Sequence, residues 1–146
     1  SVKFPEEIED AKVGTIVVDF DETLSHYAEW AKVSVKKLKA LNGFGRKKKI
    51  IVNRPIKISF LRTSPETFEQ KRREHHIAIQ QDFFKNYRVH TTLLRKIRKG
   101  ETIWKICNSL YSMPYWLLSV YNPGKDVKSI MPGDLITIPL IRSKKT

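Results

Sequence analysis

Apolar positions along the chain follow two spacings, and both spacings occur twice in the same order. Residues 16–18 form a short run of branched side chains, which is typical of a β-strand. The next apolar residues have the i, i+3, i+4, i+7 spacing of a two-turn helix: Leu24, Tyr27, Ala28 and Ala31. Thr23 or Asp21 can cap this helix. The first pattern therefore predicts a strand followed by a short helix.

A second short helix and a closing strand complete the first pattern. Ser34 is the expected cap of the helix, and Val35, Leu38 and Leu41 lie on one of its faces. Asn42-Gly43 is a stop signal after it. Alternation over residues 55–60 predicts the closing strand. The unit is expected to run strand, helix, helix, strand.

The same order returns later in the chain. Residues 93–97 are strand-like, the helical stripe is expected at Ile103, Ile106, Cys107 and Leu110, and residues 113–121 predict the second helix, with Pro114 near its first turn. A turn at residues 132–134 leads into a strand at 135–138. Glu22 and Thr23 fall 79 positions before Glu101 and Thr102, and Asn42 falls 80 before Asn122. We interpret the chain as an internal duplication.

The segment between the two patterns predicts a long helix. Ser64-Pro65-Glu66 is a helix start, and residues at helical spacing follow it to about Tyr87: Phe68, Arg72, His76, Ile79, Phe83 and Tyr87. The second helix of the later pattern is apolar nearly all round, so it needs a cover. We expect the cover to be a partner protein or these residues of the long helix: Ile79, Phe83, Phe84 and Tyr87.

These patterns predict an α+β fold of two small βααβ modules, at residues 14–61 and 92–141, joined by a helical spacer at 62–91. In each module the first and last strands should pair antiparallel beneath the two helices. Residues 1–13 are expected to form a lead-in strand or loop.

Composition limits the partners of the chain. Twenty-eight Lys and Arg against 15 Asp and Glu give a net charge of +13, which favours polyanions. No apolar run is long enough to span a membrane, and the single Cys107 excludes an intrachain disulfide. The chain starts at Ser1 without Met and without a signal-peptide pattern, so we expect a mature or excised piece.

Catalytic and metal-binding signals are weak. Residues 15–24 resemble the first motif of haloacid-dehalogenase-type phosphatases, with Asp19 and Asp21 as the acidic pair, but the downstream acidic pair that this chemistry needs to hold Mg²⁺ has no counterpart, and Asp134 stands alone in a turn. His75 and His76 are expected on the surface of the spacer helix, because the histidines lack metal-ligand spacing. We therefore expect no enzyme activity in this segment, no cofactor and no metal.

Three blocks of the later module resemble the lysin motif, the LysM carbohydrate-binding module. They read IRKGETIWKIC at residues 97–107, LLSVYNP at 117–123 and IMPGDLITIP at 130–139. The first module departs from the pattern, with Asp21 in place of Gly100 and Asn53-Arg54 in place of Gly133-Asp134. Because Asn tolerates a left-handed backbone, we expect the fold to survive there.

The resemblance implies a βααβ fold that binds N-acetylglucosamine polymers, peptidoglycan or chitin, in a shallow groove. The implied binding residues are Gly100, Glu101, Thr102, Ile103, Asn122, Pro123, Gly124 and Ile130. A second, weaker site would comprise Asp21, Glu22, Thr23, Leu24, Asn42 and Gly43. The resemblance further implies a segment of a bacterial envelope or periplasmic protein that anchors a larger assembly to the cell wall.

Other interpretations remain open. Thr102 could be only a helix cap, Asn122 only a helix stop and Ile103 only core. A degenerate first copy and the aromatics Trp30, Trp116 and Phe84, expected to be exposed, favour a rival in which the fold is a protein-interaction adaptor without a sugar groove. Nucleic-acid binding is less favoured, because no stacking-aromatic platform accompanies the basic runs.

Overall fold

The computed structural model describes residues 12–46 and 48–145. The chain folds into two compact units. Unit 1 extends to Ile79 and unit 2 begins at Gln80, so the boundary falls within the long helix α3 (Pro65–Asn86). The expected lead-in lies outside the described residues except for Lys12 and Val13. Within the part of the chain that is described, no helix has both the length and the apolar character needed to cross a bilayer.

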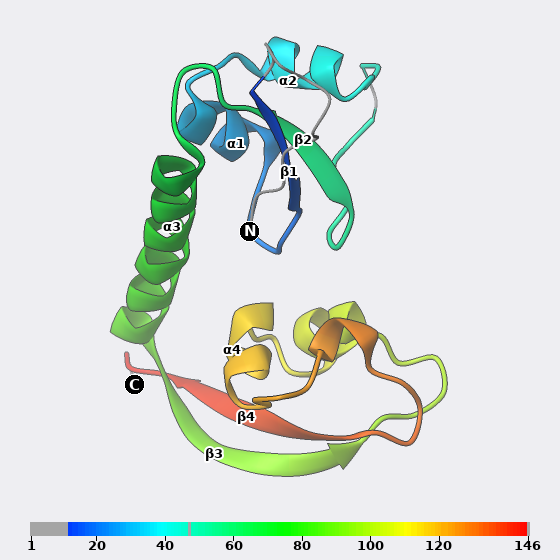
Figure 1. Cartoon of the computed structure of the whole chain (residues 1–146). Helices are drawn as coiled ribbons and strands as arrows, with labels where there is room; N and C mark the ends of the chain where they lie inside the picture. Colours follow the sequence, from blue (N-terminus) through cyan, green and yellow to red (C-terminus); the bar gives the residue numbers. More distant parts are fainter. Residues whose placement is uncertain (1–11, 47, 146) are drawn as a thin grey trace. The chain divides into compact units, whose positions relative to one another are not determined.

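Unit 1 has the predicted strand, helix, helix, strand order. Strands β1 (Val13–Val17) and β2 (Pro55–Ser59) pair antiparallel, with Ile16 opposite Ile56. Helices α1 (Leu24–Ala31) and α2 (Val35–Leu41) lie over one face of this ribbon (Figure 1). Thr23 and Ser34 cap the two helices, as their positions in the sequence predict.

The core of unit 1 also includes the beginning of α3. Phe68 is fully buried and packs against Tyr27, Trp30 and Phe60. The expectation that Trp30 is exposed is wrong, since only 6% of its surface is accessible. A short βααβ unit has a small core of its own, and the first turns of α3 enlarge it.

Unit 2 repeats the order with different helical geometry. Strands β3 (Tyr87–Lys96) and β4 (Leu135–Ser143) pair antiparallel below α4 (Tyr115–Val120). The other helical segments are a π-helix, η1 (Lys105–Leu110), and a 3-10 turn, η2 (Val127–Ser129). β3 begins at Tyr87, earlier than the expected strand, whereas α3 ends at Asn86, close to the expected end of the long helix at about Tyr87. Pro114 stands at the N-cap of α4, next to its first turn, as expected.

The π-helix explains why one predicted core residue is exposed. Ile106 and Cys107 are buried as expected, but 43% of Leu110 is exposed. The amide of Tyr111 donates to the carbonyl of Ile106, five residues earlier, instead of four. Wider turns rotate later residues away from an α-helical stripe, so Leu110 leaves the core face.

Helix α4 is covered on one side by the end of α3. The rings of Phe83 and Phe84 lie 5.2 and 5.6 Å from the ring of Trp116, in edge-to-face arrangements. Tyr87 stacks on Phe83 from the first position of β3. Val120, on α4, stays 58% exposed, so the predicted cover is partial.

In both units a single asparagine joins the second helix to the closing strand. The Asn122 amide donates to the carbonyls of Leu118 and Thr137 at 2.7 and 2.8 Å, and its oxygen accepts the Thr137 amide at 2.8 Å. Asn42 makes the same three bonds 80 positions earlier, to Leu38 and Lys57. We call this arrangement the asparagine tie.

Turn geometry also repeats between the units. The peptide groups of Ile97 pair with Gly133 and Asp134, and those of Val18 pair with Asn53 and Arg54. Gly133 and Asn53 both have positive φ, of 95° and 73°. The left-handed backbone expected at Asn53 is therefore confirmed.

Loss of the tie should destabilise unit 2 without touching its surface. We expect Asn122→Ala to lower the free energy of unfolding by about 2 to 3 kcal/mol, because it leaves buried backbone groups without partners. Urea unfolding, followed through unit 2 amide signals in NMR spectra, measures this change. Asn108→Ala is the control, since Asn108 is exposed and its amide donates to the carbonyl of Trp104, at the start of the same helix. Equal stability of the two variants would contradict the tie.

Candidate functional site

The first wall of the implied groove in unit 2 is the loop that enters the first helix. Gly100 is exposed and has φ of 84°, and the exposed Thr102 accepts the Lys105 amide at 3.2 Å through its hydroxyl. Thr102 is thus a helix cap. Ile103 is half-buried against the core of unit 2. The wall exposes main chain at Gly100 and ends in an apolar side chain.

Glu101 holds this loop in place. Its carboxylate accepts the Arg98 amide at 2.8 Å and pairs with the Arg95 guanidinium, which also donates to the Tyr111 hydroxyl at 3.1 Å. The bonds from Arg98 and Arg95 hold the pKa of Glu101 below its usual range. Both carboxylate oxygens have partners within the unit, so we assign Glu101 a positioning role.

The second wall follows helix α4. Asn122 is only 4% exposed, and both ends of its amide are used by the tie. Pro123 and Gly124 are exposed, and Gly124 has φ of 78°. Ile130 is half-buried on the same core cluster as Ile103. The tie therefore anchors a wall whose accessible part is Pro123, Gly124 and the edge of Ile130.

Both walls of the implied groove lie within one segment of unit 2. Residues 96–139 match the LysM domain. A LysM domain is therefore present in unit 2, and its α+β fold agrees with the two-helix, two-strand arrangement described above. No curated protein matches the chain.

Two solved structures resemble the chain weakly. One is the spore cortex-lytic enzyme SleL of Bacillus cereus, with 12% identity, a TM-score of 0.32, and coverage of 88% of this chain and 23% of that one. The other is the same-named enzyme of Bacillus megaterium QM B1551, with 15% identity, a TM-score of 0.28 and coverage of 89% and 23%. The chain thus spans about a quarter of the length of these proteins.

In unit 1 the corresponding loop has similar local geometry. Asp21 has φ of 59°, like Gly100, and the Thr23 hydroxyl accepts the His26 amide at 3.1 Å, as Thr102 does with Lys105. Glu22, Thr23 and Leu24 line a groove of about 650 Å³. Asn42 and Gly43, the other expected wall, are absent from the lining of this groove, and the Asn42 amide is used by the tie.

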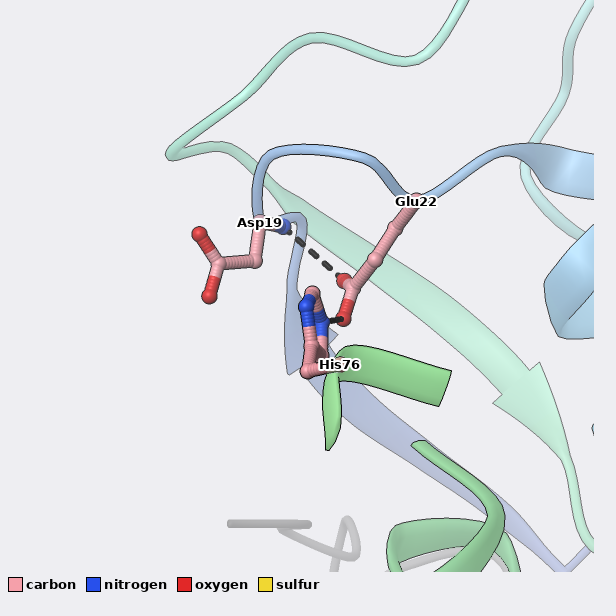
Figure 2. A group of neighbouring side chains, drawn as sticks. All are labelled: Asp19, Glu22 and His76. Carbon is pink, nitrogen blue, oxygen red and sulfur yellow. Dashed lines mark hydrogen bonds and ion pairs between the residues drawn. The ribbon is translucent and has the colours of Figure 1, made fainter. Parts of the chain in front are cut away.

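Glu22 is the centre of a buried ion-pair cluster, which we call the Glu22 clasp. Its side chain has no accessible surface. Arg72 of α3 donates to both carboxylate oxygens, from Nε at 2.6 Å and Nη2 at 2.7 Å. The Tyr27 hydroxyl, the Asp19 amide and His76 Nε2 contact the same carboxylate at 2.6, 3.0 and 2.7 Å (Figure 2 shows Asp19 and His76). The clasp fixes the first half of α3 to unit 1.

The clasp changes the pKa values of its members. Burial alone would raise the pKa of Glu22, but the hydrogen bonds from His76, Arg72 and Tyr27 outweigh it and hold the pKa well below its usual range. The bond to Glu22 raises the pKa of His76. Burial and then the Glu22 bond raise the pKa of Tyr27.

The expected surface position of His75 and His76 is wrong. His75 Nε2 contacts the Asp21 carbonyl at 2.7 Å, and its ring lies 5.1 Å from Trp30 and 4.3 Å from His26. Both histidines are half-buried. Their pattern in the sequence gave no sign of this, because their partners are about 50 positions away. A carboxylate in a short loop, in a chain that also has a long helix rich in Arg and His, is the signal that could have suggested these contacts.

Asp19, Glu22 and His76 each place one possible metal-ligand atom within 4.8 Å of the others. In Figure 2 the Asp19 carboxylate points away from Glu22. The Arg72 guanidinium already occupies both Glu22 oxygens, and its charge opposes a second cation there. The arrangement therefore favours an ion-pair cluster over a metal site.

The strand before Asp19 also differs from the phosphatase motif. β1 pairs antiparallel with β2, whereas the phosphatase motif needs a parallel strand.

The clasp should make the stability of unit 1 depend on pH. His76 has a higher pKa in the folded state, so its contribution is complete below its unfolded pKa of about 6.5 and is lost as pH rises through the folded value. Removing His76 as His76→Gln should therefore cost about 1 kcal/mol more at about pH 6 than at about pH 9.

Urea unfolding at the two pH values, followed through unit 1 amide signals, measures the difference. His90→Gln, at an exposed position in unit 2, is the control and should show no such change. The same cost of His76→Gln at both pH values would refute a protonated His76 in the clasp.

Proposed function

We propose that unit 2 binds a polymer containing N-acetylglucosamine, with peptidoglycan as the main ligand and chitin as a related one. The observation that carries this proposal is the LysM match, which covers both walls of the implied groove. The binding residues would be Gly100, Thr102 and Ile103 on one side and Pro123, Gly124 and Ile130 on the other. Glu101 and Asn122 would position these walls.

The chemistry of the two walls suits an N-acetylated sugar. A helix entrance and a helix exit leave backbone amides and carbonyls without helical partners, and these can bond an acetamido group. The half-buried Ile103 and Ile130 can contact its methyl group, and the exposed Pro123 can pack on a sugar ring. Such a site recognises the sugar without a charged side chain or a metal.

We further propose that unit 1 is a diverged copy of the same module. The tie, the capping threonine and the positive φ values recur at the offsets that the sequence predicts. If both grooves bind one polymer, binding at one groove raises the effective concentration of the polymer at the other, and the overall affinity increases. The chain would act in the bacterial periplasm or cell envelope, where it would anchor a larger protein to the wall.

The rival function is a protein-interaction adaptor. It is favoured by apolar side chains that stay exposed on unit 2, including Phe84 at 42%, Val120 at 58% and Trp104 at 65%. Trp30 no longer supports this rival, because it is buried. Trp116 supports it less, since Phe83 and Phe84 partly cover its ring.

Titration of the full chain with chitin oligomers separates the two functions. The amides of Gly100, Thr102, Ile103 and Gly124 should shift as the sugar is added, and Pro123→Arg should weaken binding about tenfold by filling the groove. Pro132→Arg is the matched control, because Pro132 is also an exposed loop proline of unit 2 but lies outside both walls. If millimolar sugar leaves these amides unmoved, or if both variants bind equally well, unit 2 does not use this groove.

A further inference from the structure

The groove of unit 1 differs from a neutral sugar site in its charge. Its lining includes the apolar side chains Leu24, Val35 and Ile50, and four cations among the described residues: Lys39, Arg46, Lys48 and Lys49. Lys39 comes from helix α2, and the other three come from the loop that follows this helix. The cations therefore approach the groove from two segments of the chain.

The one carboxylate among the described residues of the lining does not balance these cations. Glu22 is buried, and its charge is already paired with Arg72 and bonded by His76. The groove therefore carries a net positive potential close to Lys39 and the basic loop. Concave surfaces of one charge sign concentrate ligands of the opposite sign.

A second hollow extends the basic surface. It has a volume of about 280 Å³, shares Lys48, Lys49 and Ile50 with the groove, and is also lined by Arg54. Lys48 Nζ lies 5.2 Å from the centre of the Phe44 ring. The loop thus presents the same cations to two adjoining hollows, which suits an extended ligand more than a single small ion.

We propose that the unit 1 groove binds a glycan segment through anionic substituents, either carboxylates or phosphates. This inference rests on the proposed function, in which unit 1 meets the same wall polymer as unit 2. An uncharged sugar would offer these four cations no anionic group, whereas carboxylates or phosphates of a ligand would pair with them. Among the described residues that line the groove there is no aromatic ring, and those of the adjoining hollow add the one ring of Phe44, so a series of stacked nucleic-acid bases has no platform there.

Two triple variants of the full chain test the inference at equal net charge. Arg46→Gln/Lys48→Gln/Lys49→Gln removes cations that line the groove, and Arg62→Gln/Lys37→Gln/Lys57→Gln removes as many exposed cations of unit 1 from outside its lining. The probes are soluble peptidoglycan fragments with free peptide carboxylates, the same fragments with amidated carboxylates, a phosphodiester polyol, an uncharged chitin oligomer and a single-stranded oligonucleotide. NMR shifts of the Thr23, Ser25 and Ile50 amides report on the groove.

The groove variant should bind an anionic glycan probe about tenfold more weakly than the parent chain, and the control variant within about twofold. Preference for the carboxylate or for the phosphate probe assigns the source of the anion. Equal losses of affinity in the groove variant and the control variant would overturn the inference. So would binding of the amidated fragments as tight as that of the free carboxylates, if the phosphate probe does not bind. Tighter binding of the oligonucleotide than of the glycan probes would also overturn it. Failure of the function proposed for unit 2 is distinguishable, because the chitin oligomer is read from unit 2 amides.

Discussion

The asparagine tie is the interaction on which the proposed binding surface depends. A helix end and a strand edge each leave backbone groups that need partners, and in unit 2 the buried Asn122 amide satisfies two carbonyls and one amide at once. The same bonds fix where the chain leaves helix α4, and so fix the wall at Pro123 and Gly124. A residue that the LysM resemblance places among the ligand contacts thus acts by holding the neighbouring main chain in place.

The two units use the same loop position in different ways. Glu22 and Glu101 each accept the backbone amide three residues earlier, which shapes the entrance to the first helix. Glu101 also forms an ion pair with Arg95 of its own unit, near the surface. Glu22 is buried and adds Arg72 and His76 from α3, so a loop carboxylate has become the anchor of the long helix. Arg72 and His76 balance the negative charge of Glu22. The nearby lysines therefore set the charge of the unit 1 groove.

Local patterns in the sequence predict most of the fold. The strand and helix order, the caps at Thr23 and Ser34 and the left-handed turn at Asn53 each depend on a few neighbouring residues, and the structure has them as expected. The failures involve distant partners or unusual helical geometry. Trp30 is buried by α3, about 40 positions away, and Leu110 leaves the core because a π-helix replaces the α-helix that its spacing suggests.

The two loops around the asparagine tie of unit 2 form the proposed glycan site. Intermolecular nuclear Overhauser effects between a chitin oligomer and the isotope-labelled chain test it most directly. The account predicts contacts from the acetyl methyl protons of the sugar to the methyl groups of Ile103 and Ile130, and from a sugar ring to Pro123. Contacts confined to the outer face of β3, or to the exposed side of α4 at Val120, would contradict it.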